Sequence, residues 1–153
     1  HMRLEEELQR SRRHSLSLGF LMIDIDDFKI VNDSFGHLAG DAVIRDVAEI
    51  LRRSVRVFDV CARFGGEEFA IILPGLDAEQ AQAFAEAMRR AVELRALPHP
   101  TSPVAAVVTA SLGVASIIAS RGDTPATLVH ETDLALYRAK SKGRNRVESA
   151  GVD

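Results

Sequence analysis

The chain has little or nothing of several features that mark special classes of protein. Cys61 is its single cysteine, so no disulfide can form within the chain and no zinc site can be built from cysteines. No apolar run approaches the roughly 20 residues of a membrane span, and no signal peptide is visible. The net charge of -3 gives no general attraction to nucleic acid. We therefore expect a cytoplasmic domain with no nucleic-acid partner and no direct membrane contact.

What is present is the composition of one globular domain. The chain has 153 residues, of which 46% are hydrophobic and 27% charged, with neither repeats nor low-complexity segments. Residues 1–17 differ from the rest, because His1-Met2 resembles the scar of a tag and the helix-favouring stretch after it has only Leu4 and Leu8 on one apolar stripe. We interpret residues 1–17 as a tag remnant and a truncated helical connector, and residues 18–150 as the folded domain.

Hydrophobic periodicity predicts the element order β-α-β-β-α-β-α, with a short final strand near Val147. The expected strands cover residues 18–25, 58–63, 67–73 and 104–116, and the expected helices cover 39–53, 78–96 and 125–142. Residues 32–37 are expected to form a loop. The order contains a β-α-β-β-α-β unit, which is the ferredoxin-like arrangement. The sequence therefore predicts an α/β (α+β) fold, a ferredoxin-like palm with a largely antiparallel central sheet flanked by helices.

The most informative stretch is Gly65-Gly66-Glu67-Glu68, which lies between two expected strands. A Gly-Gly pair in this position indicates a hairpin, and the missing Cβ atoms let a ligand approach the backbone closely. Asp24 ends the first strand, which neighbours the third strand in a ferredoxin-like sheet. We therefore expect Asp24 and Glu67 to meet at one sheet edge, where two carboxylates can hold Mg²⁺. Taken alone, Asp24, Asp26 and Asp27 could instead cap a helix or a turn.

Four further polar residues are candidates for binding, and three of them have a second interpretation. Lys140 and Arg144 could pair with the C-terminal end of the last helix or clamp phosphate groups. Asn32 and Asp41 could read the donor and acceptor edge of guanine. Asp41 could equally support the first turn of its own helix.

Six motifs together resemble the GGDEF domain of bacterial diguanylate cyclases, in that family's order and at its spacings, over about Leu18 to Val147. They are Asp24–Asp33, Phe35–His37, Gly40-Asp41, Arg63–Phe69, Ser111–Ala115 and Ala135–Asn145. The resemblance implies the palm fold of nucleotidyl cyclases and the condensation of two GTP to cyclic di-GMP and two pyrophosphates. It also implies a homodimer, in which the 3′-hydroxyl of each GTP attacks the α-phosphorus of the other.

The resemblance further implies roles for the residues at matching positions. Asp24, the carbonyl of Ile25 and Glu67 resemble the ligands of Mg²⁺ or Mn²⁺. Glu67 and Glu68 would help to deprotonate the attacking hydroxyl, and Lys29 would stabilise the pentavalent phosphorus. The implied substrate-binding residues are Phe28, Lys29, Asn32, Asp41, Gly65, Gly66, Lys140 and Arg144.

Arg56 and Asp59, just upstream of the glycine pair, match the family's RxxD inhibitory motif. Without the resemblance they would be an ordinary surface ion pair of small energy. The resemblance implies that they form an allosteric site for cyclic di-GMP, whose binding would lower activity by product feedback. A second inhibitory arginine is often found in the following helix, and the motif places neither Arg89 nor Arg90 at that position.

The chain departs from the family before the first strand, where Arg3–Leu18 contains no Asp-x-Leu-Thr-x-Leu-x-Asn-Arg segment. In the family that segment shapes the nucleotide pocket and links to an upstream sensory or regulatory domain, so the activity of this chain by itself stays open. Two alternatives to the cyclase are a non-catalytic module that senses cyclic di-GMP or GTP, and another palm-type nucleotidyl cyclase. The intact Gly65–Phe69 hairpin favours the cyclase.

Overall fold

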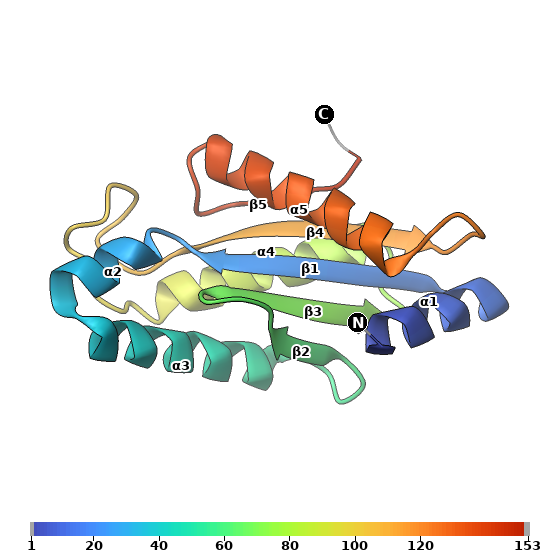
Figure 1. The fold of residues 1–153 in the computed structure, drawn as a ribbon, viewed down its shortest axis with the longest axis horizontal. Coiled ribbons are helices and arrows are strands. Elements are labelled where there is room, and N and C mark those ends of the chain that lie inside the picture. Colours follow the sequence, from blue (N-terminus) through green and yellow to red (C-terminus); the bar gives the residue numbers. More distant parts are fainter. Residues whose placement is uncertain (1, 152–153) are drawn as a thin grey trace.

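The computed structural model describes residues 2–151, with side chains from residue 3 onward. A five-stranded sheet lies at its centre (Figure 1). The strands are β1 (Ser17–Ile25), β2 (Val60–Arg63), β3 (Glu68–Pro74), β4 (Ala110–Ile118) and β5 (Val147–Ser149). Their order in the sheet is β2-β3-β1-β4-β5, and all neighbours are antiparallel except β4 and β5. The predicted fold class, a ferredoxin-like and largely antiparallel sheet flanked by helices, is confirmed.

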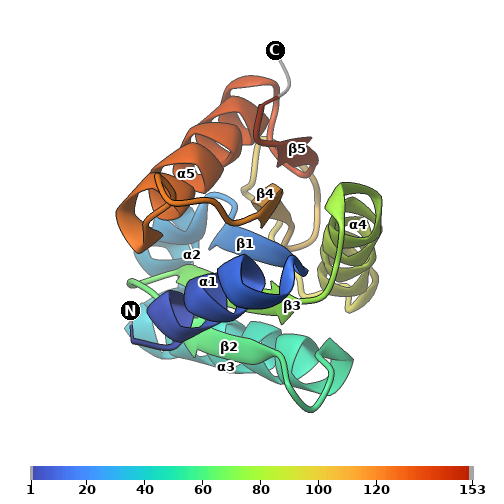
Figure 2. The same ribbon diagram turned by 90° about the vertical axis from the view of Figure 1, so that its right-hand side faces the viewer.

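The helices cover both faces of this sheet (Figures 1 and 2). They are α1 (Met2–His14), α2 (Phe28–Phe35), α3 (His37–Ser54), α4 (Ala78–Leu94) and α5 (Pro125–Ser141). Alternate residues of β1 and β3 pack against α3 and α4 on one face, and the residues between them pack against α1 and α5 on the other. Because both faces are covered, β1 is apolar almost throughout. No helix within residues 2–151 is long and apolar enough to cross a membrane.

Helix α1 is part of the packed structure, although its sequence offers little apolar surface. Leu4 and Leu8 are 4% and 0% exposed and belong to the same buried cluster as Phe20. The guanidinium of Arg12 donates hydrogen bonds to the carbonyls of Ser120 and Asp123, at 3.0 and 2.7 Å. Tertiary contacts therefore stabilise a helix that would be marginal in isolation. His1, interpreted above as a tag remnant, lies outside the described residues.

The predicted loop over residues 32–37 is wrong, because the short helix α2 extends to Phe35. Phe28 and Val31 are buried on one side of it, and eight residues are too few for a clear apolar period in the sequence. Gly36 ends the helix with a positive φ of 89°, and its N–H donates to the carbonyl of Asn32. Asn32 therefore lies on a helix rather than on a loop.

The predicted strand over residues 104–116 begins too early, since β4 starts at Ala110. Ala110 pairs with Ile25, the last residue of β1, so no further strand partner exists upstream of this point. The preceding residues form a loop closed by a single bridge between Pro98 and Val107. This loop becomes important for the candidate site.

Candidate active site

The Gly65-Gly66 hairpin forms as predicted between β2 and β3. The N–H groups of Phe64 and Gly65 both donate to the carbonyl of Glu68, at 2.7 and 3.3 Å. The guanidinium of Arg63 donates to the carbonyls of Gly65 and Gly66, at 3.1 and 2.6 Å. Hydrogen bonds within the hairpin therefore hold the backbone of the turn.

Asp24 and the two glutamates meet at one end of the sheet, where β1 ends beside the start of β3, as the strand order requires. Asp24 lies opposite Glu68 in the register of β1 and β3, and the N–H of Ile25 donates to the carbonyl of Glu67 at 3.2 Å. The Asp24 side chain is only 8% exposed and forms an ion pair with the ammonium of Lys140 from α5. The sheet and α5 thus bring the predicted metal-binding and phosphate-binding residues together.

Burial raises the pKa of Asp24 from its ordinary value of 3.8 to about 6, although Lys140 lowers it in part. The nearby carboxylates of Glu67 and Glu68 raise it further. The ionised form of Asp24 is therefore disfavoured mainly by burial and only partly stabilised by Lys140.

The donor set at this edge fits Mg²⁺ or Mn²⁺. Within residues 2–151, no three His, Cys, Asp or Glu side chains are arranged to hold a metal ion. The predicted ligands are instead two carboxylates, from Asp24 and Glu67, and the backbone carbonyl of Ile25. This set suits Mg²⁺, which usually takes one or two protein carboxylates and completes its octahedron with water and phosphate oxygens.

Asp26 has a structural role that the sequence left open. It is 3% exposed, and its carboxylate accepts hydrogen bonds from the hydroxyls of Thr109 (2.7 Å) and Ser111 (2.6 Å) and from the N–H of Asn145 (3.0 Å). Both carboxylate oxygens are therefore used within the protein. Asp26 joins the end of β1 to β4 and to the segment after α5.

Asn145 in that segment is held from its other side by α4. Its side-chain amide donates to Glu93 at 2.6 Å and accepts from Arg89 at 2.8 Å. Arg89 also pairs with Glu86, and its side chain is 15% exposed. Of the two arginines considered for the inhibitory site, Arg89 is thus engaged in fixing the loop that carries Arg144.

Helix α2 begins at Phe28, shortly after the end of β1 and four residues beyond Asp24. Asp27 adopts a left-handed conformation (φ 51°), and its side chain caps no amide within the described part of the chain. The first amides of a helix have no partner inside it, so the N–H groups of Phe28 and Lys29 can bind an anion. Arg144 lies nearby, with its Nε 3.9 Å from a carboxylate oxygen of Asp27.

Asn32 and Asp41 lie at the junction of α2 and α3. A Cβ built on Gly40 would lie 1.8 Å from Oδ1 of Asn32, so the Asn32 amide rests directly against Gly40. This oxygen is buried and has no hydrogen-bond donor among residues 2–151. Asp41 is exposed one residue further along α3. The junction therefore combines an unpaired buried acceptor with a free carboxylate.

Arg56 and Asp59 lie at the opposite end of β3 from Glu68. The guanidinium of Arg56 pairs with the fully buried carboxylate of Asp59 (2.7 Å) and donates to the carbonyl of Pro74 (2.8 Å). It also lies over the ring of Phe58, 4.4 Å from the ring centre. This rigid arrangement is more than a surface ion pair, and it is separate from the carboxylate edge.

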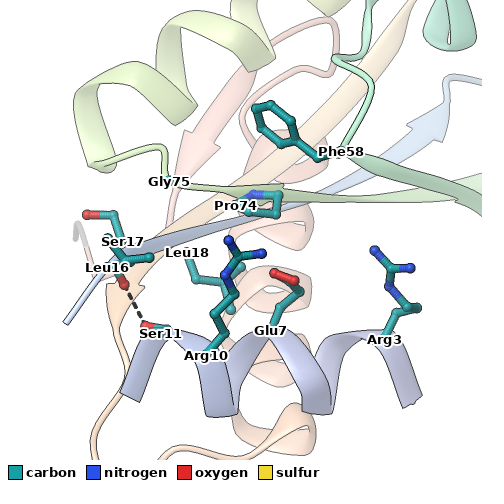
Figure 3. Close-up of a pocket in the computed structure, with 10 residues that line it drawn as sticks. All are labelled: Arg3, Glu7, Arg10, Ser11, Leu16, Ser17, Leu18, Phe58, Pro74 and Gly75. Carbon is teal, nitrogen blue, oxygen red and sulfur yellow. Dashed lines mark hydrogen bonds between the residues drawn. The ribbon is translucent and has the colours of Figure 1, made fainter. Parts of the chain in front are cut away.

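A pocket of about 290 Å³ adjoins this second cluster, between α1 and the end of β3 (Figure 3). Arg3, Glu7 and Arg10 point from α1 toward Pro74 and Phe58 on the other side. Residues 1–17 were expected to be only a tag remnant and a truncated connector, because they offer little apolar surface. The packing of α1 on the sheet reveals that Arg3 and Arg10 line the same pocket as Phe58.

The comparisons with known proteins agree with the motifs. A family model described as "Diguanylate cyclase, GGDEF domain" matches residues 1–146. Diguanylate cyclase DgcP from Pseudomonas aeruginosa is 42% identical over 149 residues, which cover 97% of this chain and 22% of DgcP. The chain spans about a quarter of the length of such curated relatives.

Solved structures share the fold. The GGDEF domain of DgcB from Caulobacter crescentus, determined in complex with c-di-GMP, has a TM-score of 0.89 and 33% identity, over 99% of this chain and 88% of that one. The active GGEEF domain of a diguanylate cyclase from Vibrio cholerae has a TM-score of 0.84 and 33% identity, over 99% of this chain and 94% of that one.

Proposed function

Because this chain belongs to the GGDEF domain family of diguanylate cyclases, we propose that it condenses two GTP to cyclic di-GMP and two pyrophosphates. The resemblance found from six sequence motifs is confirmed by the family match. The observation that carries the proposed reaction is the convergence of Asp24, the Glu67-Glu68 hairpin and Lys140 at one sheet edge. Phosphoryl transfer needs positioned charges more than covalent help from the protein, and this edge supplies both signs of charge.

The carboxylate edge is the proposed metal site. Asp24, the Ile25 carbonyl and Glu67 would hold Mg²⁺ or Mn²⁺, which when bound neutralises charge on the phosphate oxygens. A cation there would favour the ionised carboxylate of Asp24, whose pKa is otherwise raised mainly by burial.

The triphosphate is bound by groups from two helices and the hairpin. The amides of Phe28 and Lys29 and the Lys29 ammonium approach it from α2, and Lys140 and Arg144 approach it from the end of α5. Gly65 and Gly66 let the α-phosphate come close to the hairpin backbone. Lys140 neutralises Asp24 in the structure, and with nucleotide bound it would contact a phosphate oxygen instead.

Guanine is recognised at the junction of α2 and α3. Guanine presents N–H donors at its N1 and N2 positions, which require acceptors. The buried, unpaired Oδ1 of Asn32 and the exposed Asp41 carboxylate are such acceptors. Adenine has an acceptor at N1, which would face these oxygens unfavourably. This chemistry favours GTP over ATP.

The reaction requires two copies of the domain. Each domain has one such hairpin and therefore presents one GTP, whereas the product joins two nucleotides. In the proposed homodimer, Glu67 or Glu68 helps to deprotonate the 3′-hydroxyl that attacks the α-phosphorus of the opposite GTP. Pyrophosphate then leaves from each nucleotide.

Product inhibition is proposed at the Arg56 cluster. The Arg56 guanidinium can bind phosphate and stack on guanine, and its position over Phe58 already forms a stacking surface. Arg10 and Arg3, which line the adjoining pocket, add positive charge for a cyclic dinucleotide. Binding there would lower activity as product accumulates.

We place the domain in the cytoplasm and under the control of an upstream sensory or regulatory domain. The proposal for a further domain is supported by the length of the relatives, since the 149 matched residues cover only 22% of DgcP.

The test is incubation with GTP and Mg²⁺, followed by identification of the products. Both this chain and a longer version with its preceding segment should be assayed. We expect two pyrophosphates per cyclic di-GMP and a specific activity that rises with protein concentration, because the active unit is a dimer. If the longer protein binds GTP but releases no pyrophosphate at any concentration, the non-catalytic sensing module replaces the cyclase.

A further inference from the structure

We propose that His99 is a positioning residue that holds the start of α2 in the conformation that binds the triphosphate. His99 lies in the loop before β4, and no motif discussed above includes it. The proposal rests on the function proposed above, and it adds a residue far in sequence from the catalytic edge. Substitution of His99 is expected to lower kcat/KM for GTP by more than a loss of stability explains.

The imidazole of His99 makes a single directed contact. The side chain is completely buried, and its Nε2 lies 3.1 Å from the backbone carbonyl oxygen of Asp27. A carbonyl oxygen can only accept, so Nε2 must carry the hydrogen. Nδ1 is buried and has no hydrogen-bond partner among residues 2–151. The contact with Asp27 is therefore the one polar function that the ring serves in the described structure.

Asp27 is a residue whose conformation needs support. It is not glycine, yet it adopts the left-handed region at the residue that precedes α2. Its carbonyl also accepts from the N–H of Ile30 at 3.1 Å, so the helix start and His99 share one acceptor. If the His99 contact is lost, this turn can relax toward a common conformation. The N–H groups of Phe28 and Lys29 would then change direction.

His99 can act as a brace because its own loop is firmly closed. The N–H of His99 donates to the Ala106 carbonyl at 2.8 Å, and the N–H of Val108 donates to the Leu97 carbonyl at 2.8 Å. The carbonyl of His99 accepts from Ser102, which tightens the tip of the loop. The ring thus projects from a backbone with little freedom.

The same loop contacts the other end of α2. The hydroxyls of Ser34 and Thr101 lie 3.3 Å apart. The loop therefore touches α2 at both ends, near Asp27 and near Ser34. A helix of eight residues gains little stability from its own hydrogen bonds, so external contacts of this kind determine where it lies.

The alternative is that His99 only fills space in the core. Two substitutions separate these roles. His99→Leu keeps an apolar side chain of similar reach but cannot donate to Asp27. His99→Gln places an amide N–H donor at a similar distance from the backbone. His14→Leu is the matched control, because His14 is exposed at the end of α1, away from α2.

We expect His99→Leu to lower kcat/KM for GTP at least tenfold, and His99→Gln to recover most of that loss. Hydrogen–deuterium exchange at the amide of Ile30, whose N–H donates to the Asp27 carbonyl, should become at least tenfold faster in His99→Leu, and stay near the wild-type rate in His99→Gln and His14→Leu. Melting temperatures measured on all three variants show whether a general loss of stability explains the result.

A space-filling role predicts equal defects in the Leu and Gln variants, or a defect that follows melting temperature alone, and either result overturns the proposal. Unchanged exchange at the Ile30 amide in His99→Leu also overturns it. If the wild-type protein itself makes no cyclic di-GMP, the proposed function fails. The exchange measurement needs no turnover, so it still decides whether His99 holds the start of α2.

Discussion

The ammonium of Lys140 forms an ion pair with the carboxylate of Asp24, although 116 positions separate the two residues in the sequence. One belongs to a group predicted to bind phosphate and the other to a group predicted to bind metal. Their contact shows that α5 and β1 contribute to a single charged site. Under the proposed function, nucleotide and metal would rearrange this pair when they bind.

Asp24 should make the stability of the domain depend on pH. Its pKa is raised from 3.8 to about 6, chiefly by burial, so the folded protein binds this proton more tightly than the unfolded chain. The resulting stabilisation is complete below about pH 3.8 and is lost as pH rises through 6. The shift corresponds to about 3 kcal/mol of unfolding free energy. Urea unfolding at several pH values, compared with Asp24→Asn, measures this contribution.

Without divalent metal at pH 7, Asp24→Asn should therefore be more stable than the wild type. Mg²⁺ should stabilise the wild type and have less effect on this variant, because the neutral amide is a poorer ligand. Asp33→Asn, a change at an exposed position of α2, is the control and should behave as the wild type. A wild type whose stability does not fall between pH 4 and pH 6, relative to Asp24→Asn, would contradict the expectation.

Glu67→Gln should reduce cyclic di-GMP formation by about 10²-fold or more, because the amide can neither take a proton nor bind metal well. Pyrophosphate release and chromatography of the product measure the loss. Circular dichroism should show an intact fold. Glu79→Gln, at an exposed position of α4, makes the same chemical change away from the hairpin and should retain activity. Near-normal turnover by Glu67→Gln would show that Glu67 is not required for the reaction.

Arg56→Lys should weaken cyclic di-GMP binding at least tenfold, although it keeps the positive charge. Lysine lacks the planar fork that pairs with Asp59 and the flat surface that lies over Phe58. Calorimetry with cyclic di-GMP measures the affinity, and progress curves with GTP should show less inhibition at late times. Arg53→Lys, an exposed change one residue before the end of α3, is the control. Unchanged affinity would reject this site.

Gly40→Ala should raise KM for GTP at least tenfold. The new Cβ would lie 1.8 Å from Oδ1 of Asn32, so the amide that accepts from guanine must move. Selectivity for GTP over ITP, which lacks the N2 amino group, should also fall. Gly122→Ala adds the same methyl group where no described atom lies within 4 Å, and it should have no effect. A normal KM in Gly40→Ala would show that Asn32 does not read the base.

Gly113→Ala should destabilise the domain by about 1–3 kcal/mol. A Cβ at this position of β4 would lie 2.3 Å from the Thr132 carbonyl and 2.5 Å from the Leu136 nitrogen, both in the α5 backbone. A helix backbone cannot yield as a side chain can, so α5 must shift and carry Lys140 with it. Urea unfolding measures the loss, and turnover should fall further than stability alone predicts.

Much of the fold could be predicted because its elements have strong local patterns. The continuous apolar run of β1, the Gly65-Gly66 turn and the capping residues Asp77 and Thr124 all specify local structure. The neighbouring positions of β1 and β3 followed from the element order. The short helix α2 could not be predicted, since its conformation depends on burial of Phe28 and on contacts from a distant loop rather than on a repeated pattern.

The same division applies to the candidate site. The sequence by itself determined the fold class, the hairpin and which residues are proposed to carry the chemistry, because these depend on local periodicity and on motifs at fixed spacing. Only the tertiary structure decided that Lys140 neutralises Asp24, that Asp26 and Arg89 serve as internal supports, and that His99 reaches Asp27. Those contacts join residues far apart in the chain, and their geometry is set by how the helices pack on the sheet.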